Sequence, residues 1–298
     1  TVLTTLVAAA VPAAQAPAWP TRPIQLVHGF GAGGNADVIA RLVAQKLQDQ
    51  IGKPVVVEIK SGAGGMIATQ AVAKAEPDGH TLVMLTGAHT VSAALRKTLP
   101  YDPVHDFTFI STVTAFPFVI AVRASGKISY SSVGVGSTQH LVGELLAGTA
   151  GVQLLHVPYR GGGAPVQSVM AGEVDLLIDT PTVAVPHLQA GKLRALGVTS
   201  ATPWPTLPGV MPVAQTLPQF EVRSWLGLAA PAGLPAPIAQ RLNAEVKTLL
   251  QRPDVMQTLT LAGSAASYSS SQSMQDMVQN DIARWRSVIA RRNIQLEN

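Results

Sequence analysis

Short apolar runs typical of β-strands alternate along this chain with longer amphipathic runs typical of α-helices. The strand-like runs lie at residues 24–28, 54–59, 81–85, 107–112, 118–123, 128–132, 154–159, 174–179, 193–199 and 224–230. Helix-like runs lie between many of them, at residues 36–50, 66–75, 138–149, 164–172 and 182–191. This alternation predicts an α/β fold in which helices cover parallel sheets.

The chain changes character after a proline-rich connection at residues 202–220. Beyond it, helix-like runs at 235–251, 253–263 and 269–293 follow one another, each opened by Pro or Ser. A chain of 298 residues that is 47% hydrophobic can bury one large core or two moderate ones. We therefore expect two domains.

Four glycine-rich loops each follow a strand-like run and precede a helix-like run. They are GFGAGGNAD at 29–37, SGAGGM at 61–66, SVGVGSTQH at 132–140 and YRGGGAP at 159–165. The first loop places Gly29, Gly31 and Gly34 in the G-x-G-x-x-G spacing of dinucleotide-binding loops. Glu58 ends the next strand-like run, about where a ribose-binding acid would lie. Taken alone, this loop predicts a nucleotide-dependent α/β oxidoreductase.

The repetition of such loops argues against a single cofactor site. The helix after the first loop opens with Asn35 and Asp37, whose polar side chains suit a helix cap or hydrogen bonds to a small ligand. The free N–H groups at a helix start favour an anion. Any one loop is equally well explained as a tight turn, but four together favour ligand binding without a cofactor.

Residues 1–16 are uncharged, apolar and rich in small side chains, and they end in Ala14-Gln15-Ala16. This pattern is typical of the second half of a secretory signal peptide, so we expect cleavage after Ala16 and a periplasmic protein. A disordered or helical N-terminal arm is the alternative. No later stretch reaches the ~18 uninterrupted apolar residues of a membrane span.

Charge and cysteine content narrow the choice of partners and chemistry. Only 13% of the residues are charged, the net charge is +4, and no basic run is interleaved with aromatic residues, so we expect no nucleic-acid partner. The absence of cysteine excludes disulfides, cysteine-zinc sites and thiol nucleophiles. The seven histidines show no H-E-x-x-H spacing and no G-x-S-x-G motif is present, so we expect neither a metal site nor a hydrolase.

A set of longer motifs occurs in order across nearly the whole chain after residue 16. They are WPTRPIQLV, AGGNADVIAR, GKPVVVEIKSGAGGMIATQAVAKAEPDGHTLVM, LPYDPVHDFTFIS, HVPYRGGGAPVQSVMAGEVD, AGKLRALGVTS and SWLGLAAPAGLP. Together they resemble the Bug family, the periplasmic solute-binding components of tripartite tricarboxylate transporters. The resemblance implies a two-domain periplasmic-binding-protein-like fold with a ligand cleft between the domains. It also implies a monomer that binds a small organic acid without catalysis and delivers it to the membrane components of a transporter.

The resemblance also implies where the ligand lies. We expect domain I to combine residues 18–114 and 225–298, domain II to contain 115–224, and crossing strands to join them. The ligand carboxylate is expected between the loops 30–37 and 131–140, held mainly by N–H and hydroxyl groups. The expected ligand-binding residues are Phe30, Gly33, Gly34, Asn35, Asp37, His89, Ser132, Gly136, Ser137, Thr138, His140, Tyr159 and Asp179.

Four of these residues rest on separate reasoning. Asp179 ends a strand-like run, at the edge where open α/β sheets bind ligands, although a helix-capping role explains it equally well. His89 and His140 follow ligand-side loops and could donate to a carboxylate. Tyr159, together with Arg160, is expected to line or gate the cleft.

The chain departs from the family pattern in two places. The family usually has a proline in the first loop where this chain has Gly29 and Gly31, so the G-x-G-x-x-G spacing is interpreted as coincidental. The family usually has a whole helix where this chain has only residues 124–127 between two strand-like runs. Because parallel neighbours need about a dozen residues between them, either these strands form a hairpin or a segment is missing from the sequence.

Overall fold

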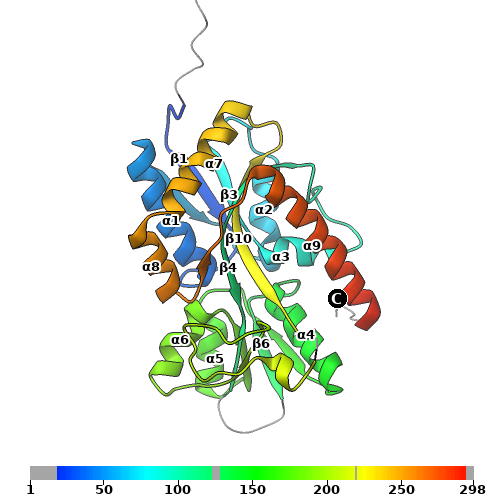
Figure 1. Cartoon of the computed structure of the whole chain (residues 1–298). Helices are drawn as coiled ribbons and strands as arrows, with labels where there is room; N and C mark the ends of the chain where they lie inside the picture. The colour runs from blue at the N-terminus through cyan, green and yellow to red at the C-terminus, as the bar shows by residue number, and fades with distance from the viewer. Residues whose placement is uncertain (1–18, 123–127, 219, 293–298) are drawn as a thin grey trace, which may run out of the picture.

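The computed structural model describes residues 19–122, 128–218 and 220–292. These residues form two lobes, each built on one β-sheet, and two long strands run from one lobe into the other (Figure 1). The expected signal peptide at residues 1–16 and the short link at 123–127 lie outside the described residues. Within the described part of the chain, no helix combines the length and apolarity needed to cross a membrane.

The first lobe contains a six-stranded sheet with the order β11-β4-β10-β3-β1-β2. Its strands are β1 (Ile24–His28), β2 (Val55–Ile59), β3 (Thr81–Thr86), β4 (Phe107–Pro117), β10 (Arg223–Pro231) and β11 (Ala265–Ala266). Strand β1 pairs in parallel with β2 and β3. Strand β10 runs antiparallel to both β3 and β4.

Helices cover both faces of this sheet because the strands bury side chains on both sides. They are α1 (Asn35–Ile51), α2 (Met66–Ala73), α3 (Gly87–Leu95), α7 (Ala236–Leu250), α8 (Pro253–Leu261) and α9 (Ser271–Arg292), with a 3₁₀ turn at Ala63–Gly65. On one face, Leu26 and Leu82 pack in the cluster that contains α1 and α7. On the other, their neighbours Val27 and Val83 pack in the cluster that contains α2 and α9.

The second lobe contains a five-stranded sheet with the order β7-β6-β8-β5-β9. Its strands are β5 (Val119–Val122), β6 (Ser129–Ser132), β7 (Leu155–Pro158), β8 (Leu176–Asp179) and β9 (Arg194–Val198). Its helices are α4 (Thr138–Ala150), α5 (Ala164–Ala171) and α6 (Pro181–Gln189), and a 3₁₀ turn follows at Val213–Gln215. Three of its loops, before α4, α5 and α6, open toward the first lobe (Figure 1).

The structure corrects three expectations from the sequence. The sheets are mixed rather than parallel, because β10 returns antiparallel to its neighbours and β5 runs antiparallel to β8 and β9. Strands β5 and β6 do not form a hairpin, because β8 lies between them. They run in opposite directions, so no long crossover is needed between them. Helix α3 was not anticipated.

The two lobes are joined where the crossing strands lie side by side. Strand β4 leads through Phe118 directly into β5, and β10 pairs with β4 along its length (Figure 1). Thr199, which follows β9, ties the two crossing segments together. Its hydroxyl accepts a hydrogen bond from Phe118 N at 2.8 Å and donates one to the Val222 carbonyl at 2.6 Å. Both crossing segments are therefore held at one fixed point between the sheets.

Candidate ligand-binding cleft

Four helices begin at one cavity between the lobes. Helices α1 and α3 belong to the first lobe, and α4 and α6 belong to the second. The cavity has an open volume of about 40 Å³. Its walls are Phe30, Gly34, Asn35, Ala36, Thr86, Ala88, Phe116, Phe118, Val133, Thr138, Gln139, Gly162, Asp179, Thr180, Ser224 and Leu226. A cavity of this volume holds about three water-sized groups, since one water molecule needs roughly 10–15 Å³.

Two of the four helix starts have no side-chain cap. The N-cap residues of α1 and α6, Gly34 and Thr180, accept no hydrogen bond with their side chains. By contrast, Thr86 accepts from Ala88 N at the start of α3, and Ser137 accepts from His140 N at the start of α4. The first N–H groups of an uncapped helix need an outside partner. The helix dipoles add a positive potential at the same ends, so the cavity suits an anion.

Two residues that line this cavity each have a buried polar side-chain atom without a hydrogen-bond partner. The amide nitrogen Nδ2 of Asn35 has no hydrogen-bond acceptor, whereas its Oδ1 accepts from the Thr182 hydroxyl at 2.7 Å. The Oδ2 atom of Asp179 likewise has no partner, while its Oδ1 accepts from Thr180 N at 2.7 Å. An unsatisfied buried group costs about 1–3 kcal/mol. Both groups are therefore available to a ligand.

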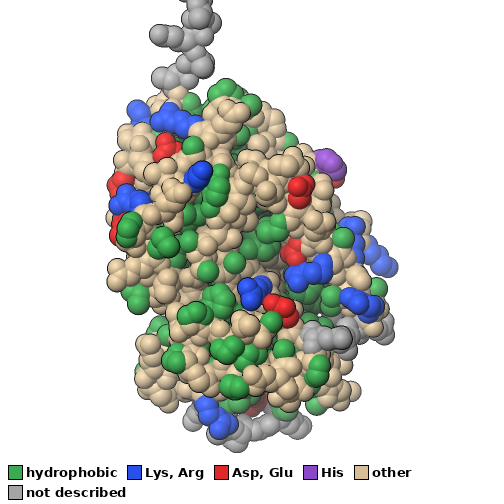
Figure 2. Space-filling view, viewed as in Figure 1, with side chains coloured by type: hydrophobic (Ala, Val, Ile, Leu, Met, Phe, Trp, Pro, Cys, Tyr) green, Lys and Arg blue, Asp and Glu red, His purple; other side chains and the backbone are tan. Residues whose placement is uncertain are grey.

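The electrostatics of the cavity come from backbone rather than from basic side chains. Among the described residues that line it, Asp179 alone has a titratable side chain. Burial raises the pKa of Asp179 to about 6, although hydrogen bonds from Thr180 and Gln139 act against this. On the face shown in Figure 2, the Lys, Arg, Asp and Glu side chains lie in small separate groups over both lobes. A bound anion would thus be held by N–H dipoles and neutral donors.

The remaining wall of the cavity is apolar. Phe116 lies near the end of β4, and Phe118 lies between β4 and β5. Their ring centroids are 6.0 Å apart and their planes meet at 79°. Phe30, Val133 and Leu226 complete this wall. An apolar wall beside the donors excludes water, which strengthens each polar contact inside.

Five of the expected ligand-binding residues line this cavity: Phe30, Gly34, Asn35, Thr138 and Asp179. Gly33 and Asp37 lie behind it. The Asp37 carboxylate accepts from Gly33 N at 3.0 Å and pairs with Arg41 Nε at 2.9 Å and His28 Nε2 at 3.2 Å. Burial alone would raise the pKa of Asp37, but the hydrogen bonds from Arg41 and Gly33 hold it below its ordinary value. Asp37 therefore fixes the loop from within.

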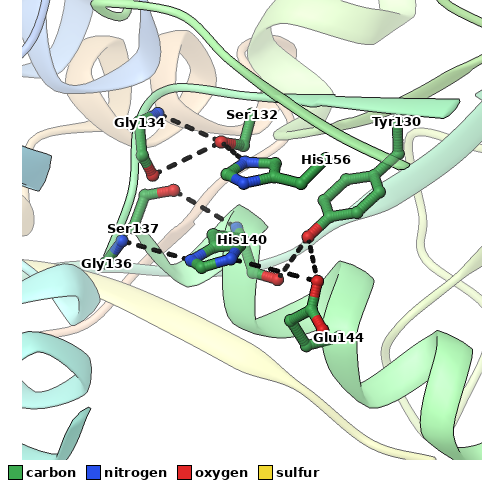
Figure 3. A network of polar contacts seen from close by, with 8 residues as sticks. All are labelled: Tyr130, Ser132, Gly134, Gly136, Ser137, His140, Glu144 and His156. Atoms are coloured by element: carbon green, nitrogen blue, oxygen red, sulfur yellow. Dashed lines mark hydrogen bonds and ion pairs between the residues drawn. The ribbon is translucent and has the colours of Figure 1, made fainter. Parts of the chain in front are cut away.

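Four other expected residues belong to a buried hydrogen-bond network in the loop at residues 131–140 (Figure 3). They are Ser132, Gly136, Ser137 and His140. Gly136 N donates to His140 Nδ1 at 3.2 Å, and the His140 backbone N–H donates to the Ser137 hydroxyl at 3.2 Å. The hydroxyl of Ser132 accepts from Gly134 N at 3.1 Å. These contacts hold the loop's shape and leave the Thr138 end facing the cavity.

The His140 ring is held neutral in this network. Because Nδ1 accepts a hydrogen bond, it carries no proton, and the ring stacks on His156 with centroids 4.0 Å apart. His156 in turn lies 2.7 Å from the Ser132 hydroxyl. Burial lowers the pKa of His140 to about 4, and burial together with His140 lowers that of His156 to about 3. The neutral His140 ring therefore holds the loop at residues 131–140 in place and supplies no positive charge to a ligand.

His89 and Tyr159 lie elsewhere. His89 is buried in α3, where its Nε2 meets the Pro103 carbonyl at 2.8 Å and its ring stacks on Tyr101 at 5.8 Å. Burial lowers its pKa to about 4. Tyr159 lines a second, larger cavity together with Arg160. Neither residue lines the cavity at the four helix starts.

The glycine-rich loops meet in pairs across the cleft. A Cβ atom on Gly31 would lie 2.8 Å from Gly162 N, and one on Gly64 would lie 2.9 Å from the Val135 carbonyl oxygen. Each distance is too short for a real side chain, so these loops are surfaces of close backbone approach. Gly31 is covered by Gly162, and Glu58 pairs with Lys60 at 2.7 Å. This arrangement gives no support to the oxidoreductase interpretation of the first loop.

Several cavity residues were not predicted from the sequence. Thr86 and Thr180 stand at the N-cap positions of helices that follow strands, and this position could have identified both. Phe116, Phe118 and Ser224 lie in or beside the crossing strands and carry no motif. Gln139 follows the expected Thr138 by one residue. No three His, Asp or Glu side chains in the described part of the chain lie close enough to form a metal site.

The chain matches known proteins over most of its length. Residues 39–294 match the family described as the tripartite tricarboxylate transporter family receptor. A protein encoded in the tcbD–tcbE intergenic region of Pseudomonas sp. is 37% identical over 291 residues, which are 91% of this chain and 87% of that relative.

Two solved structures share the fold closely. An adipate-bound protein of R. palustris gives a TM-score of 0.89 at 34% identity, with 93% of this chain and 99% of that chain covered. The periplasmic binding protein BugD gives a TM-score of 0.89 at 29% identity, with 94% and 100% covered. The second of these structures is described as a periplasmic binding protein, and the matched family is described as a receptor family. The chain therefore belongs to the Bug family of tripartite tricarboxylate transporter receptors, as its motifs indicated.

Proposed function

We propose that this protein is an extracytoplasmic receptor that holds a small carboxylate between its two lobes and delivers it to the membrane components of a tripartite transporter. The observation that carries the proposal is the meeting of four helix starts, two from each lobe, at one cavity between the lobes. Adipate bound to a relative of the same fold is consistent with this ligand class. We also propose that the protein is a monomer and performs no catalysis.

One carboxylate group of the ligand is proposed to occupy the cavity. Its oxygens would accept from the N–H groups of Asn35 and Ala36 at the start of α1, from the Asn35 amide, and from the Thr138 end of α4. Hydrogen bonds to a charged group contribute roughly 1.5–3 kcal/mol each. The cavity of about 40 Å³ has room for such a group. The expected residues behind the cavity would act by holding the loops.

The proposal includes the division of the chain and its export. Domain I is proposed to combine residues 18–114 and 225–298, and domain II to contain 115–224, which is consistent with helices α7 and α9 packing on the first sheet. A signal peptide is proposed to end at Ala16. Mass spectrometry of the protein from a periplasmic extract tests the second point, and an unprocessed cytoplasmic chain would contradict it.

The ligand site is tested by an Asn35→Asp substitution. This change removes the free amide donor and adds a negative charge beside the proposed carboxylate. We expect the dissociation constant for organic acids found in a thermal-shift screen to rise by about tenfold or more, measured by calorimetry. Asn280→Asp is the matched control, because Asn280 is exposed on α9. Equal affinity in both variants, or no organic acid bound by the wild type, would contradict the proposal.

A further inference from the structure

A second cavity lies beside the proposed ligand site and has a different chemical character. Its volume is about 470 Å³, within the ~300–1,000 Å³ range of small-molecule sites. Its walls are Ser61, Gly62, Ala63, Gly64, Ile67 and Arg96 from the first lobe, and Val133, Gly134, Val135, Pro158, Tyr159 and Arg160 from the second. Val133 lines both cavities.

The charged side chains that line this cavity are all basic. They are Arg96 and Arg160, and none of the described residues that line it is Asp, Glu or His. Neither guanidinium group makes an ion pair or a hydrogen bond to any described residue of the protein, although the Arg96 backbone N–H donates to the Ser92 carbonyl at 3.1 Å. The Nε atom of Arg96 is buried without a partner. A buried donor without an acceptor is costly. The described residues supply no acceptor for Arg96 Nε, so a ligand would have to supply it.

The two arginines come from opposite sides of the cleft. Arg96 is the C-cap residue of α3, and a Cβ atom on Gly136 of the facing loop would lie 3.7 Å from its Nη2. Arg160 follows β7 in the second lobe. Closing the lobes therefore brings two positive charges to one cavity, which opposes closure. An anion between them would convert this repulsion into attraction.

We propose that this second cavity is an anion site that takes a carboxylate group held by Arg96 and Arg160. The carboxylate has two possible sources: the far end of an extended dicarboxylate whose first carboxylate lies at the four helix starts, or a separate small acid. Arginine suits both, because its planar guanidinium binds a carboxylate through two parallel hydrogen bonds. The first source rests on the proposed function, whereas the second does not.

The test compares acids that differ only in the second carboxylate. Calorimetry with hexanoate and hexanedioate measures the advantage of the second charge in the wild type, in Arg96→Gln and in Arg160→Gln. We expect hexanedioate to bind at least tenfold more tightly than hexanoate in the wild type. In both variants we expect the two acids to bind within about twofold of each other, with hexanoate affinity unchanged. Arg194→Gln is the control, because Arg194 is exposed and lines neither cavity.

A second measurement separates the two sources of the carboxylate. Acetate is titrated into the protein without another ligand, and the melting temperature is recorded for the wild type and for the Arg96→Gln, Arg160→Gln double variant. A rise of several degrees in the wild type that the double variant lacks supports binding of a separate acid. A tenfold preference for hexanedioate without such a rise supports the far end of one ligand.

The remaining outcomes are equally decisive. If hexanoate and hexanedioate bind alike in the wild type and acetate has no effect that depends on the arginines, the second anion site is overturned while the proposed function stands. If neither acid binds at the helix starts but acetate stabilises the protein through the arginines, the anion site stands and the proposed function fails. If no acid has any effect, both are overturned.

Discussion

Gly31→Ala tests whether the meeting of glycine loops controls the closed state. A Cβ atom on this residue would lie 2.8 Å from Gly162 N, 3.0 Å from the Gly161 carbonyl carbon and 3.1 Å from Gly162 Cα. All three atoms are backbone, so no side chain can move aside. To regain the ordinary contact distance of 3.4 Å, the loops must separate by about 0.6 Å. The φ of Gly31 lies outside the left-handed region, so alanine causes no strain within its own loop.

The cost of this clash falls on the closed arrangement alone. Overpacking by one methyl group costs typically 1–3 kcal/mol. If ligand binding requires closure, the dissociation constant should rise by a factor of about 5 to 150. The ligand-free protein, whose lobes are free to separate, should unfold at nearly the wild-type denaturant concentration. Small-angle scattering should show that saturating ligand reduces the radius of gyration less than it does for the wild type.

Gly163→Ala is the matched control, because it lies in the same facing loop. A Cβ atom there meets nothing within 4 Å, and its φ of −81° suits alanine. This variant should bind ligand with wild-type affinity. Wild-type affinity and wild-type compaction in Gly31→Ala would refute the reasoning, since the loops would then not touch in the bound state.

Three further predictions concern the hinge and the titratable groups. Thr199→Val leaves Phe118 N without its acceptor and should lower the free energy of unfolding by about 1–3 kcal/mol in urea, whereas a loss below 0.5 kcal/mol would contradict the hinge contact. His140 and His156 have folded pKa values of about 4 and 3, below the ordinary 6.5, so their contribution to stability is fully present above pH 6.5 and is lost as the pH falls below it. The expected slope between pH 4 and 6.5 is up to about 1.4 kcal/mol per pH unit for each histidine, and a flat urea profile would contradict it. Affinity for a monocarboxylate should fall as the pH rises above about 6, where Asp179 ionises, and calorimetry of Asp179→Asn should show no such fall.

The strands and most helices could be predicted from the sequence because their patterns are local. Helix α3 was missed because the run from Gly87 to Leu95 begins with glycine and contains Thr90 and Val91, which favour other structures. The direction of β10 could not be predicted, because an apolar strand reads the same whether its neighbours run parallel or antiparallel. Sequence patterns fix elements, whereas the path of the chain between lobes depends on tertiary packing.

Five of the sixteen described residues that line the candidate site were predicted from the sequence, for a related reason. Asn35 and Thr138 follow glycine-rich stretches that are typical of a helix start, so both could be predicted from the sequence as ligand-binding residues. Phe116 and Phe118 are apolar strand residues that look like any core residue until the second lobe faces them. The glycine loops themselves were visible, but their role was not, since Gly31 and Gly162 approach each other only in the folded chain.

A site without basic side chains has a consequence for a receptor that must release its ligand. The donors are distributed between the lobes, with α1 and α3 on one side and α4 and α6 on the other. When the lobes separate, each half keeps only part of the donor set, and water replaces the apolar wall formed by residues such as Phe118. A dipole at a helix start acts over only about the first turn, so its attraction vanishes over a short movement, whereas the charge of a lysine or arginine would persist to about a Debye length of ~8 Å. Helix starts therefore make affinity depend steeply on closure, and a transporter that opens the lobes would release the acid without having to compete for it.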